Sequence, residues 1–373
     1  MRKLRSSPIR AVIIDDSLAV KELLISILQN SGDILVVGTG TSGEDAVRLV
    51  ERLHPDIVTM DLRIPDSDGL KAIRKIMREC PTPIVIITSF IKQSVMDLTF
   101  QALQAGALTV ISKPGLNDPE TCDKVVQTVR LMADVPVIHH WDRKDKQKRL
   151  AEKDSEKEIS SLVNSRVDIS CSDIEIIGIA ASTGGPSALV TVLRNLPNDF
   201  PLPILIVQHI SQGFVGGLAE WLSTETSMRV EIANHGDILL PGVVMVSPDD
   251  YHLQVGESGI VELSKAPLYK GFRPSANYLF ESLARVFGSH AMGVILTGMG
   301  DDGVEGINTL SQAGGVTVAQ DEESCVVYGM PHQAVARNAV HHVLTLEQIA
   351  LTFEKLGCPS STGRPQDRKG RYR

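Results

Sequence analysis

Residues 10–29 read RAVIIDDSLAVKELLISILQ, where an apolar run ends in two aspartates and an amphipathic stretch follows. An unbroken apolar run of this length is typical of a strand that is buried on both faces. The spacing of the apolar residues after Ser17 predicts a helix over residues 19–29. A buried strand followed by a helix is the repeating unit of an open parallel sheet, so this stretch predicts an α/β fold.

The same strand-and-helix unit recurs along the first third of the chain. Apolar runs predict further strands at residues 34–38, 57–60, 84–88 and 107–112. Amphipathic patterns predict further helices at residues 43–53, 69–79, 94–105 and 121–132. Together they predict an α/β domain over residues 9–132, with a five-stranded parallel sheet and helices on both faces.

The composition changes after this domain. Residues 139–158 read HHWDRKDKQKRLAEKDSEKE, dense in both charge signs, so we expect a solvated linker over residues 133–172. Strand patterns then return at residues 174–179, 204–208, 243–247 and 293–297. They predict a second, doubly wound α/β domain over residues 173–358, followed by a disordered basic tail over 359–373.

The composition also limits the classes of function. The 373 residues carry a formal net charge of -8, which argues against a nucleic-acid-binding surface. No run of about 18 apolar residues exists, so we expect no membrane span, and the N-terminal apolar run is too short for a signal peptide. The five cysteines are scattered and form no C-x-x-C pair, as in a protein of the reducing cytoplasm, where we place this chain.

Acidic and phosphate-binding residue types follow the strands of the first domain. Because the carboxyl ends of parallel strands meet at one edge of a sheet, we expect five side chains to converge: Asp15, Asp16, Asp61, Thr88 and Lys113. Crowded carboxylates need a cation, and oxygen ligands alone suit Mg²⁺. Each of these residues taken singly is more typical of a helix cap or a turn.

The grouping assigns a role to each residue. Asp61 is expected to accept a phosphoryl group and to bind Mg²⁺ together with Asp15 and Asp16. Thr88 and Lys113 are expected to contact the phosphoryl oxygens. The set resembles that of the response-regulator receiver family, through the motifs IIDDS at 13–17, MDLRIPDSDGL at 60–70, ITSF at 87–90 and ISKP at 111–114. This resemblance implies a flavodoxin-like fold for residues 9–132.

A glycine pattern in the same domain suggests a different ligand. Residues 38–43 read GTGTSG, which fits the G-x-G-x-x-G pattern of dinucleotide-binding turns. The match follows the second predicted strand rather than the first, so we expect no dinucleotide there.

The second domain places a serine between a strand and a helix. Its first strand is followed by ASTGGP at 181–186, whose glycines and proline allow a sharp turn before a helix expected over 187–195. A hydroxyl on such a turn projects past the edge of the sheet, which makes Ser182 a candidate nucleophile. A helix cap and a phosphate-binding turn are the alternatives.

A serine nucleophile needs a base and an orienting carboxylate. His209 ends the strand in PILIVQHI, and Asp301 and Asp302 follow another strand in GVILTGMGDDG. His209 would take the proton of Ser182, and we assign the orienting role to Asp302.

Backbone N–H groups of Met299 and around Thr183 are candidate donors to an oxyanion. The stretch 176–336 resembles the catalytic domain of chemotaxis protein-glutamate methylesterases, through the motifs IGIAASTGGP, VQHISQGF, LPGVVMVSPDDYHL, FRPSANYLF, GVILTGMGDDGVEG and AQDEESCVVYGMP. This resemblance assigns the triad to Ser182, His209 and Asp302, because Asp302 is the acid directly before the last glycine of TGMGDDG.

The resemblance also implies a function. Members of that family hydrolyse γ-methyl glutamate esters on the cytoplasmic helices of chemoreceptors, and many deamidate particular glutamines. The implied partners are methyl-accepting chemoreceptors as substrate and a histidine kinase as phosphodonor, with no nucleic acid and with membranes met only through receptors. The receiver would bind Mg²⁺, and the esterase site would need no cofactor. Phosphorylation would relieve a block that the unphosphorylated receiver imposes on the active site.

Other functions fit parts of the sequence. The main alternative is a receiver-controlled binding module in a two-component pathway, whose triad residues are structural. A DNA-binding regulator lacks support, since the chain is acidic and has no recognisable helix-turn-helix after the linker. The complete set of Ser182, His209 and Asp302 favours a phosphorylation-activated serine esterase.

Overall fold

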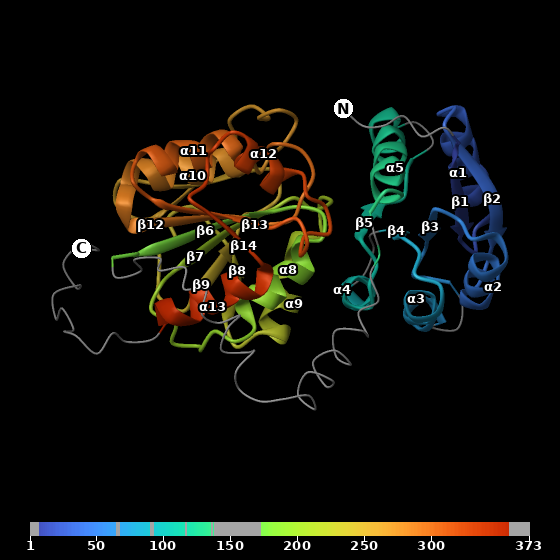
Figure 1. Cartoon of the computed structure of the whole chain (residues 1–373), viewed down its shortest axis with the longest axis horizontal. Helices are drawn as coiled ribbons and strands as arrows, with labels where there is room; N and C mark the ends of the chain where they lie inside the picture. The colour runs from blue at the N-terminus through green and yellow to red at the C-terminus, as the bar shows by residue number, and fades with distance from the viewer. Residues whose placement is uncertain are drawn as a thin grey trace. The chain divides into compact units, whose positions relative to one another are not determined.

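The structure is a computed structural model that describes residues 7–64, 68–89, 93–115, 118–135, 137 and 173–357. These residues form two compact units, one N-terminal and one C-terminal (Figure 1). The linker expected over 133–172 and the tail expected over 359–373 lie almost entirely outside the described residues, so the domain bounds stay predictions.

The N-terminal unit is built on a five-stranded parallel sheet with the strand order β2-β1-β3-β4-β5. Its strands are β1 (Ile9–Ile14), β2 (Ile34–Gly40), β3 (Ile57–Met60), β4 (Ile84–Thr88) and β5 (Thr109–Ser112). Its helices are α1 (Leu18–Asn30), α2 (Gly43–Leu53), α3 (Asp68–Glu79), α4 (Gln93–Gln104) and α5 (Pro119–Met132). Figure 1 shows α1 and α5 on one face of the sheet and α2, α3 and α4 on the other. The predicted flavodoxin-like fold is confirmed.

The local sequence explains where these elements lie. Every residue of β3 and β4 is buried, because helices cover both faces of the sheet. Short polar side chains cap the helices: Ser17 begins α1, Ser42 begins α2 and Asp118 begins α5. The strand order reverses between β1 and β3, and open sheets of this kind bind ligands outside the strand ends at that point.

The glycines of the G-x-G-x-x-G pattern serve packing between α2 and the sheet. A Cβ atom at Gly40 would lie 2.5 Å from Cβ of Asp45, and one at Gly38 would meet leucine side chains of α2. The start of α2 is already capped, since Ser42 accepts from the N–H of Asp45 and the carboxylate of Asp45 accepts from the N–H of Thr41. A carboxylate at this position would repel a phosphate, which agrees with the expected absence of a dinucleotide.

The C-terminal unit is built on a seven-stranded parallel sheet with the order β14-β13-β12-β6-β7-β9-β8. Its strands are β6 (Ile176–Ala181), β7 (Ile204–Gln208), β8 (Arg229–Ile232), β9 (Val243–Val246), β12 (Ala291–Ile295), β13 (Val316–Gln320) and β14 (His342–Leu344). An antiparallel pair, β10 (His252–Val255) and β11 (Val261–Ser264), lies outside this sheet.

Helices cover both faces of the seven-stranded sheet. They are α8 (Gly185–Leu193), α9 (Val215–Glu225), α10 (Ala276–Val286), α11 (Val304–Gln312), α12 (Met330–Ala336) and α13 (Leu346–Gly357), with a short 3₁₀ turn at Gly288–His290. Figure 1 shows α10, α11 and α12 on one face and α8, α9 and α13 on the other. Among the described residues, no helix has both the length and the apolar character needed to cross a membrane.

The strands expected at 174–179, 204–208, 243–247 and 293–297 correspond to β6, β7, β9 and β12, and the doubly wound fold is confirmed. Strands β8, β13 and β14 were not predicted from the sequence. Two of these, β8 and β14, are short edge strands with partly exposed residues, so their sequences contain polar residues and form no continuous apolar run. The helix expected to start at Ser187 begins at Gly185, because Pro186 fits the first turn of a helix.

The strand order of this sheet reverses between β6 and β12. Strands β7, β9 and β8 lie on one side of β6, and β12, β13 and β14 lie on the other. Ser182 follows β6, and Met299 lies in the loop after β12. Both residues therefore lie at the point of an open α/β sheet where ligands bind.

Candidate functional site

Ser182 lies at a sharp junction between β6 and α8. The backbone turns at Gly184, whose φ of 78° favours glycine. The N–H of Ser182 donates to the carbonyl of Thr297 at 3.0 Å, and its carbonyl accepts from the N–H of Gly185 at 2.8 Å. These bonds hold the expected nucleophile at the carboxyl end of a central strand.

The side chain of Gln208 links the backbones of the expected nucleophile and base. Its Nε2 donates to the carbonyls of Ser182 and His209, each at 2.8 Å. The register of the two strands pairs Ala181 with Gln208, so Ser182 and His209 follow directly on neighbouring strands. No role for Gln208 could be predicted from the sequence, because a glutamine inside a buried strand carries no signal of its partners.

Gly298 packs against the nucleophile from the loop after β12. A Cβ atom at this position would lie 2.7 Å from Cβ of Ser182 and 2.5 Å from Sδ of Met330. Neither approach is sterically allowed, so a larger residue would displace Ser182 or the loop.

We expect Gly298→Ala to lower kcat/KM of the esterase reaction by roughly 10- to 100-fold, since moving a reacting group by about 1 Å costs this much. Gly216→Ala in α9 is the matched control, because the nearest atom to a Cβ there lies 3.9 Å away. Steady-state rates of the two variants check this expectation. Wild-type kinetics in Gly298→Ala would show that this contact does not constrain the serine.

His209 lies between an aromatic ring and a carboxylate. Its imidazole stacks on Phe272, with ring centroids 4.4 Å apart and an angle of 10° between the planes. Its Nε2 lies 2.9 Å from Oδ2 of Asp302, an ion-pair distance without hydrogen-bond geometry, as is common in catalytic pairs before a substrate binds. Within the described residues, Nδ1 is buried and has no hydrogen-bond partner, so it is free to take part in a reaction.

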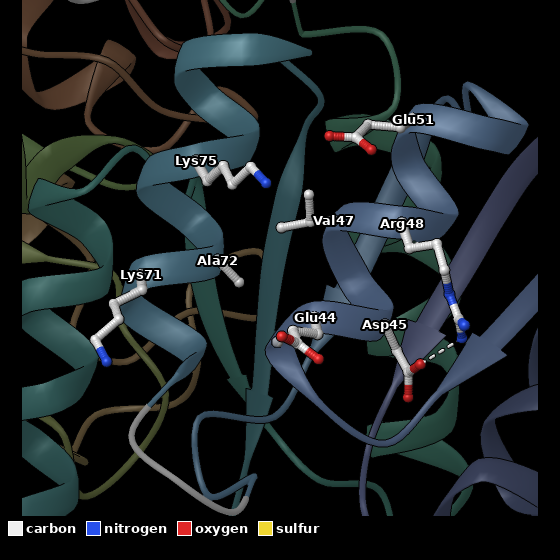
Figure 2. Close-up of a pocket in the computed structure, with 9 residues that line it drawn as sticks. Glu44, Asp45, Val47, Arg48, Glu51, Lys71, Ala72 and Lys75 are labelled. Atoms are coloured by element: carbon white, nitrogen blue, oxygen red, sulfur yellow. Dashed lines mark hydrogen bonds and ion pairs between the residues drawn. The ribbon is translucent and has the colours of Figure 1, made fainter.

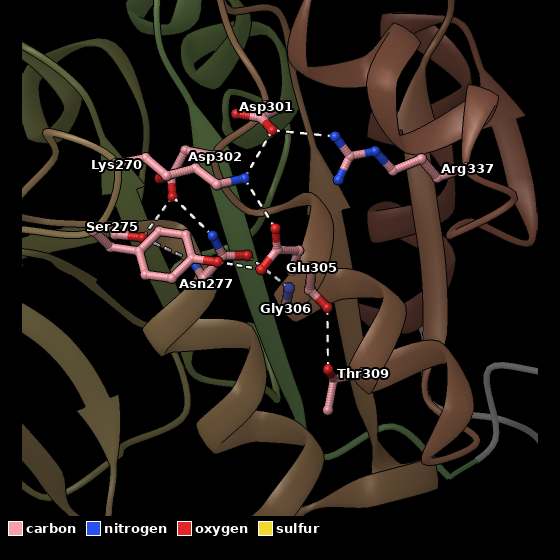
Figure 3. Close-up of polar contacts among 10 residues, drawn as sticks. Lys270, Ser275, Asn277, Asp301, Asp302, Glu305, Gly306, Thr309 and Arg337 are labelled. Carbon is pink, nitrogen blue, oxygen red and sulfur yellow. Dashed lines mark hydrogen bonds and ion pairs between the residues drawn. The ribbon is translucent and has the colours of Figure 1, made fainter.

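Asp302 is 1% exposed and is surrounded by hydrogen-bond donors (Figure 3). Its Oδ1 accepts from the hydroxyl of Ser275 at 2.5 Å and from Nδ2 of Asn277 at 3.1 Å. Its Oδ2 accepts from the N–H of Ala276 at 2.7 Å and contacts His209. Burial raises the pKa of Asp302, but the contact with His209, its charge and the donated hydrogen bonds outweigh this and hold the pKa below its usual value. Asp302 is therefore a carboxylate that can orient an imidazole.

Asp301, the neighbouring acid, has different partners. Its Oδ2 lies 2.9 Å from Nζ of Lys270 and 3.2 Å from a guanidinium nitrogen of Arg337. Its side chain is one-third exposed, and Figure 3 shows it directed away from Asp302. Of the two acids in this loop, Asp302 is the one that reaches His209.

A second, fully buried histidine supports the donors to Asp302. Nδ1 of His252 accepts from the N–H of Ser275 at 3.2 Å, and its Nε2 contacts the carbonyl of Pro267 at 3.1 Å. An acceptor role for Nδ1 places the ring proton on Nε2. Burial lowers the pKa of His252, so it is neutral at pH 7 and fixes Ser275 rather than sharing a proton. No pattern in the sequence around His252 indicates this role.

The expected oxyanion donors lie beside Ser182. In the described part of the chain, the backbone N–H groups of Thr183 and Met299 donate no hydrogen bond. Thr183 follows the serine directly, and Met299 follows Gly298, which packs on it. Free N–H groups next to a nucleophile are what a developing oxyanion needs.

Cys325, in the loop between β13 and α12, is a poor nucleophile. Burial and the neighbouring Asp321 and Glu322 carboxylates raise the pKa of the Cys325 thiol far above its usual value. A thiol in this state is protonated at neutral pH and unreactive. Cys325 therefore offers no competing nucleophile.

The five predicted residues of the N-terminal unit meet at one edge of its sheet. Nζ of Lys113 lies 2.7 Å from Oδ2 of Asp15 and 2.6 Å from Oδ2 of Asp61. The hydroxyl of Thr88 donates to Oδ1 of Asp61 at 2.9 Å. Asp61 is thus held between a hydroxyl and an ammonium, the two groups expected to contact a phosphoryl group.

Three carboxylates gather at the same edge. Oxygens of Asp15, Asp16 and Asp61 all lie within 4.8 Å of one another, with Asp16 exposed and the other two buried. A set of hard oxygen ligands that opens to solvent on one side fits Mg²⁺, which keeps several of its waters.

The ammonium of Lys113 compensates this negative charge. Burial lowers its pKa, but hydrogen bonds and charge attraction from Asp15 and Asp61 outweigh this and raise the pKa above its usual value. Because the pKa of Lys113 is higher in the folded protein than the value of about 10.4 in the unfolded chain, its ion pairs stabilise the fold fully at any pH below about 10.4. This stabilisation is lost only as the pH rises through the pKa of the folded protein. At pH 7 the contribution is therefore complete.

We expect Lys113→Met to lower the free energy of unfolding of the N-terminal unit at pH 7 by about 3 kcal/mol, because two buried carboxylates lose their counter-charge. Lys75→Met is the matched control. Lys75 is half exposed and pairs with Glu79 at 3.8 Å, so we expect a change below about 0.5 kcal/mol. Urea unfolding measures both variants, and equal losses would contradict a special role for Lys113.

A hollow between α2 and α3 lies apart from these residues (Figure 2). Its lining mixes acids and bases: Glu44, Asp45, Arg48, Glu51, Lys71 and Lys75. Asp45 and Arg48 already pair with each other at 2.6 Å. None of the five residues expected to serve phosphorylation lines this hollow.

Two family models match the chain. The model of the CheB methylesterase matches residues 177–353, and the model of the response regulator receiver domain matches residues 11–126. Each match covers the motifs through which the corresponding resemblance was recognised.

Curated relatives align along nearly the whole chain. A protein of Syntrophus aciditrophicus named protein-glutamate methylesterase/protein-glutamine glutaminase 1 is 39% identical over 351 residues, covering 93% of this chain and 98% of the relative. A Myxococcus xanthus protein named protein-glutamate methylesterase/protein-glutamine glutaminase 4 is 40% identical over 354 residues, covering 93% and 96%. Among solved structures, the CheB methylesterase catalytic domain of Thermotoga maritima is 35% identical, covers 49% of this chain and 98% of that chain, and has a TM-score of 0.48.

Proposed function

Because the chain belongs to the family of CheB protein-glutamate methylesterases, we propose that Ser182, His209 and Asp302 form its catalytic triad. The protein is a carboxylic-ester hydrolase of chemotaxis-type signalling that carries a response regulator receiver domain. Its substrates are proposed to be γ-methyl esters of glutamate on the cytoplasmic helices of methyl-accepting chemoreceptors. This substrate places the protein in the cytoplasm, with membranes met only through receptors.

The first half of the proposed reaction forms an acyl-enzyme. The hydroxyl oxygen of Ser182 attacks the ester carbonyl carbon, and Nδ1 of His209 takes the hydroxyl proton. Asp302 holds the other side of the ring and stabilises the imidazolium that results. The C–O bond to the methoxy group then breaks, and methanol leaves with the proton from His209.

The oxyanion is proposed to be bound by two backbone donors. The tetrahedral intermediate places a negative charge on the former carbonyl oxygen, and the free N–H groups of Thr183 and Met299 lie beside the serine. Donors that are fixed before the reaction stabilise this charge without reorganisation, and each is worth roughly 2.7–4 kcal/mol of barrier.

The second half releases the product. Water attacks the acyl carbon while His209 takes a proton from it, and the proton then returns to the oxygen of Ser182. The products are glutamate and the free serine. A glutamine side chain that entered the same site would release ammonia in place of methanol, so deamidation would use the same residues.

The N-terminal unit is proposed to control this reaction through Asp61, with a histidine kinase as the physiological phosphodonor. Asp15, Asp16 and Asp61 would hold Mg²⁺, whose charge neutralises the phosphoryl oxygens during transfer. Thr88 and Lys113, which already contact Asp61, would contact the phosphoryl group. Phosphorylation of Asp61 would break the ion pairs of Lys113 and so change the contacts at this edge of the sheet.

The observation that supports the proposal most is the contact of His209 with the buried Asp302. Ser182 lies beside this pair, because Gln208 donates hydrogen bonds to the carbonyls of both Ser182 and His209. Methanol release from methylated receptor membranes tests it, with and without a small-molecule phosphodonor and Mg²⁺. We expect wild type to release methanol, the phosphodonor to raise the rate, and Asp61→Asn to lose only the increase. A wild-type protein that is phosphorylated but inactive on several receptor sources would support the binding module instead.

A further inference from the structure

A tight turn brings an aromatic ring onto the proposed base. Tyr269 and Phe272 exchange two backbone hydrogen bonds, at 3.0 and 2.9 Å, which closes a two-residue loop. The loop residues Lys270 and Gly271 have φ values of 50° and 89°. Positive φ at both central residues is typical of a type I′ turn. The turn fixes where the Phe272 side chain leaves the backbone.

The ring of Phe272 lies flat on the imidazole of His209. The two centroids are 4.4 Å apart and the planes differ by 10°. A stacked neighbour prevents the imidazole from tilting away from Asp302, whose Oδ2 lies 2.9 Å from Nε2. An aromatic face at this distance also attracts a cation, so it favours the imidazolium that forms during the reaction.

The turn is anchored to residues on both sides of Asp302 in the chain (Figure 3). Nζ of Lys270 lies 2.9 Å from Asp301 and 2.9 Å from Glu305, and the hydroxyl of Tyr269 also donates to Glu305. Asp301 directly precedes Asp302, and Glu305 lies in the first turn of α11. The anchors therefore tie the stacked ring to the segment that carries the orienting acid.

The segment that contains Phe272 also contacts Asp302 through a residue further along the chain. Ser275, three positions after Phe272, donates its hydroxyl to Asp302. One short segment thus contacts the imidazole through Phe272 and the carboxylate through Ser275.

We propose that Phe272 is a positioning residue of the active site, held in place by the Lys270 anchor, and that it fixes the orientation of the His209 ring against Asp302. This inference rests on the proposed triad, because it assigns Phe272 a role only if His209 is the base. The ring acts on the orientation of the base and not on substrate binding, so its loss should appear in kcat rather than in KM.

Phe272→Leu and Phe272→Tyr in the full chain test the stacking. From the usual interaction energy of stacked aromatic pairs, we expect Phe272→Leu to lower kcat by about threefold to tenfold with KM unchanged. We expect Phe272→Tyr, which keeps an aromatic ring, to have about the wild-type kcat. Nitrogen NMR of the His209 ring gives a second measurement. We expect one tautomer, protonated on Nε2, in wild type and in Phe272→Tyr, and a mixture of tautomers in Phe272→Leu.

Lys270→Asn tests the anchor separately. Asparagine before glycine is favoured in a type I′ turn, so this variant keeps the turn and removes only the ammonium. We expect its kcat to fall by about twofold to threefold and the ring signals of His209 to broaden, since exposed ion pairs contribute little each.

The outcomes separate this inference from the proposed triad. If Ser182→Ala is inactive while Phe272→Leu keeps wild-type kcat and a single tautomer, the positioning role of Phe272 is overturned and the triad stands. If Phe272→Tyr is as impaired as Phe272→Leu, stacking is not the cause. If Ser182→Ala keeps its activity, the triad itself fails.

Discussion

Ser182→Ala is expected to lower kcat for methanol release by at least about 10⁴-fold, the largest effect of any single substitution in this protein. The variant keeps the turn, because the bonds that hold position 182 come from its backbone N–H and carbonyl. It loses only the hydroxyl oxygen that would attack the ester. Binding of methylated receptor should therefore persist while turnover stops.

Ser187→Ala is the matched control for this substitution. Ser187 is exposed on the first turn of α8, five positions after Ser182. We expect its rate to equal that of wild type. Methanol release by the two variants at saturating receptor measures the contrast, and an active Ser182→Ala protein would refute covalent catalysis by this serine.

Asp302→Asn is expected to lower kcat by about 10⁴-fold, because the imidazole loses the carboxylate that fixes its tautomer. The surroundings of Asp302 make the substitution costly for stability as well. Its two oxygens face the N–H of Ala276 and Nδ2 of Asn277, besides Ser275 and His209. In Asp302→Asn an amide N–H₂ replaces one of the two oxygens, so this new donor faces a donor of a neighbouring residue instead of an acceptor.

Asn277 cannot relieve this conflict by rotating its amide. Its Oδ1 accepts from the N–H of Gly306 at 2.6 Å, so a flipped amide would lose that bond. A buried donor without an acceptor costs about 1–3 kcal/mol of folding free energy. We therefore expect Asp302→Asn to show both effects, whereas Asp199→Asn, at an exposed loop position, should show neither. Steady-state kinetics and urea unfolding measure them, and an Asp302→Asn protein with wild-type kcat would rule out the orienting role.

The elements that carry the chemistry could be predicted from the sequence because their signals are local. Each of Asp15, Asp61 and Ser182 follows a buried apolar strand, and the carboxyl ends of parallel strands meet at one edge. The same rule brought His209 to the edge that holds Ser182. The strand register in the structure agrees with that expectation.

The residues that position this chemistry could not be predicted in the same way. Ser275 and Asp302 are 27 positions apart, and Phe272 and His209 are 63 positions apart, so their contacts depend on loop paths rather than on strand ends. No helix or strand period extends into the turn at Tyr269–Phe272. Gln208 and His252 are buried polar residues whose partners become visible only in three dimensions.

The most direct test of the central claim, covalent catalysis by Ser182, is mass spectrometry of the protein after rapid acid quench. The reaction would use a glutamyl methyl ester peptide and the phosphodonor-treated full chain. We predict that the peptide containing Ser182 gains the mass of the substrate less methanol, and that Ser182→Ala neither gains this mass nor releases methanol. Full methanol release by Ser182→Ala, with the substrate-derived mass on another residue or on none, would contradict it.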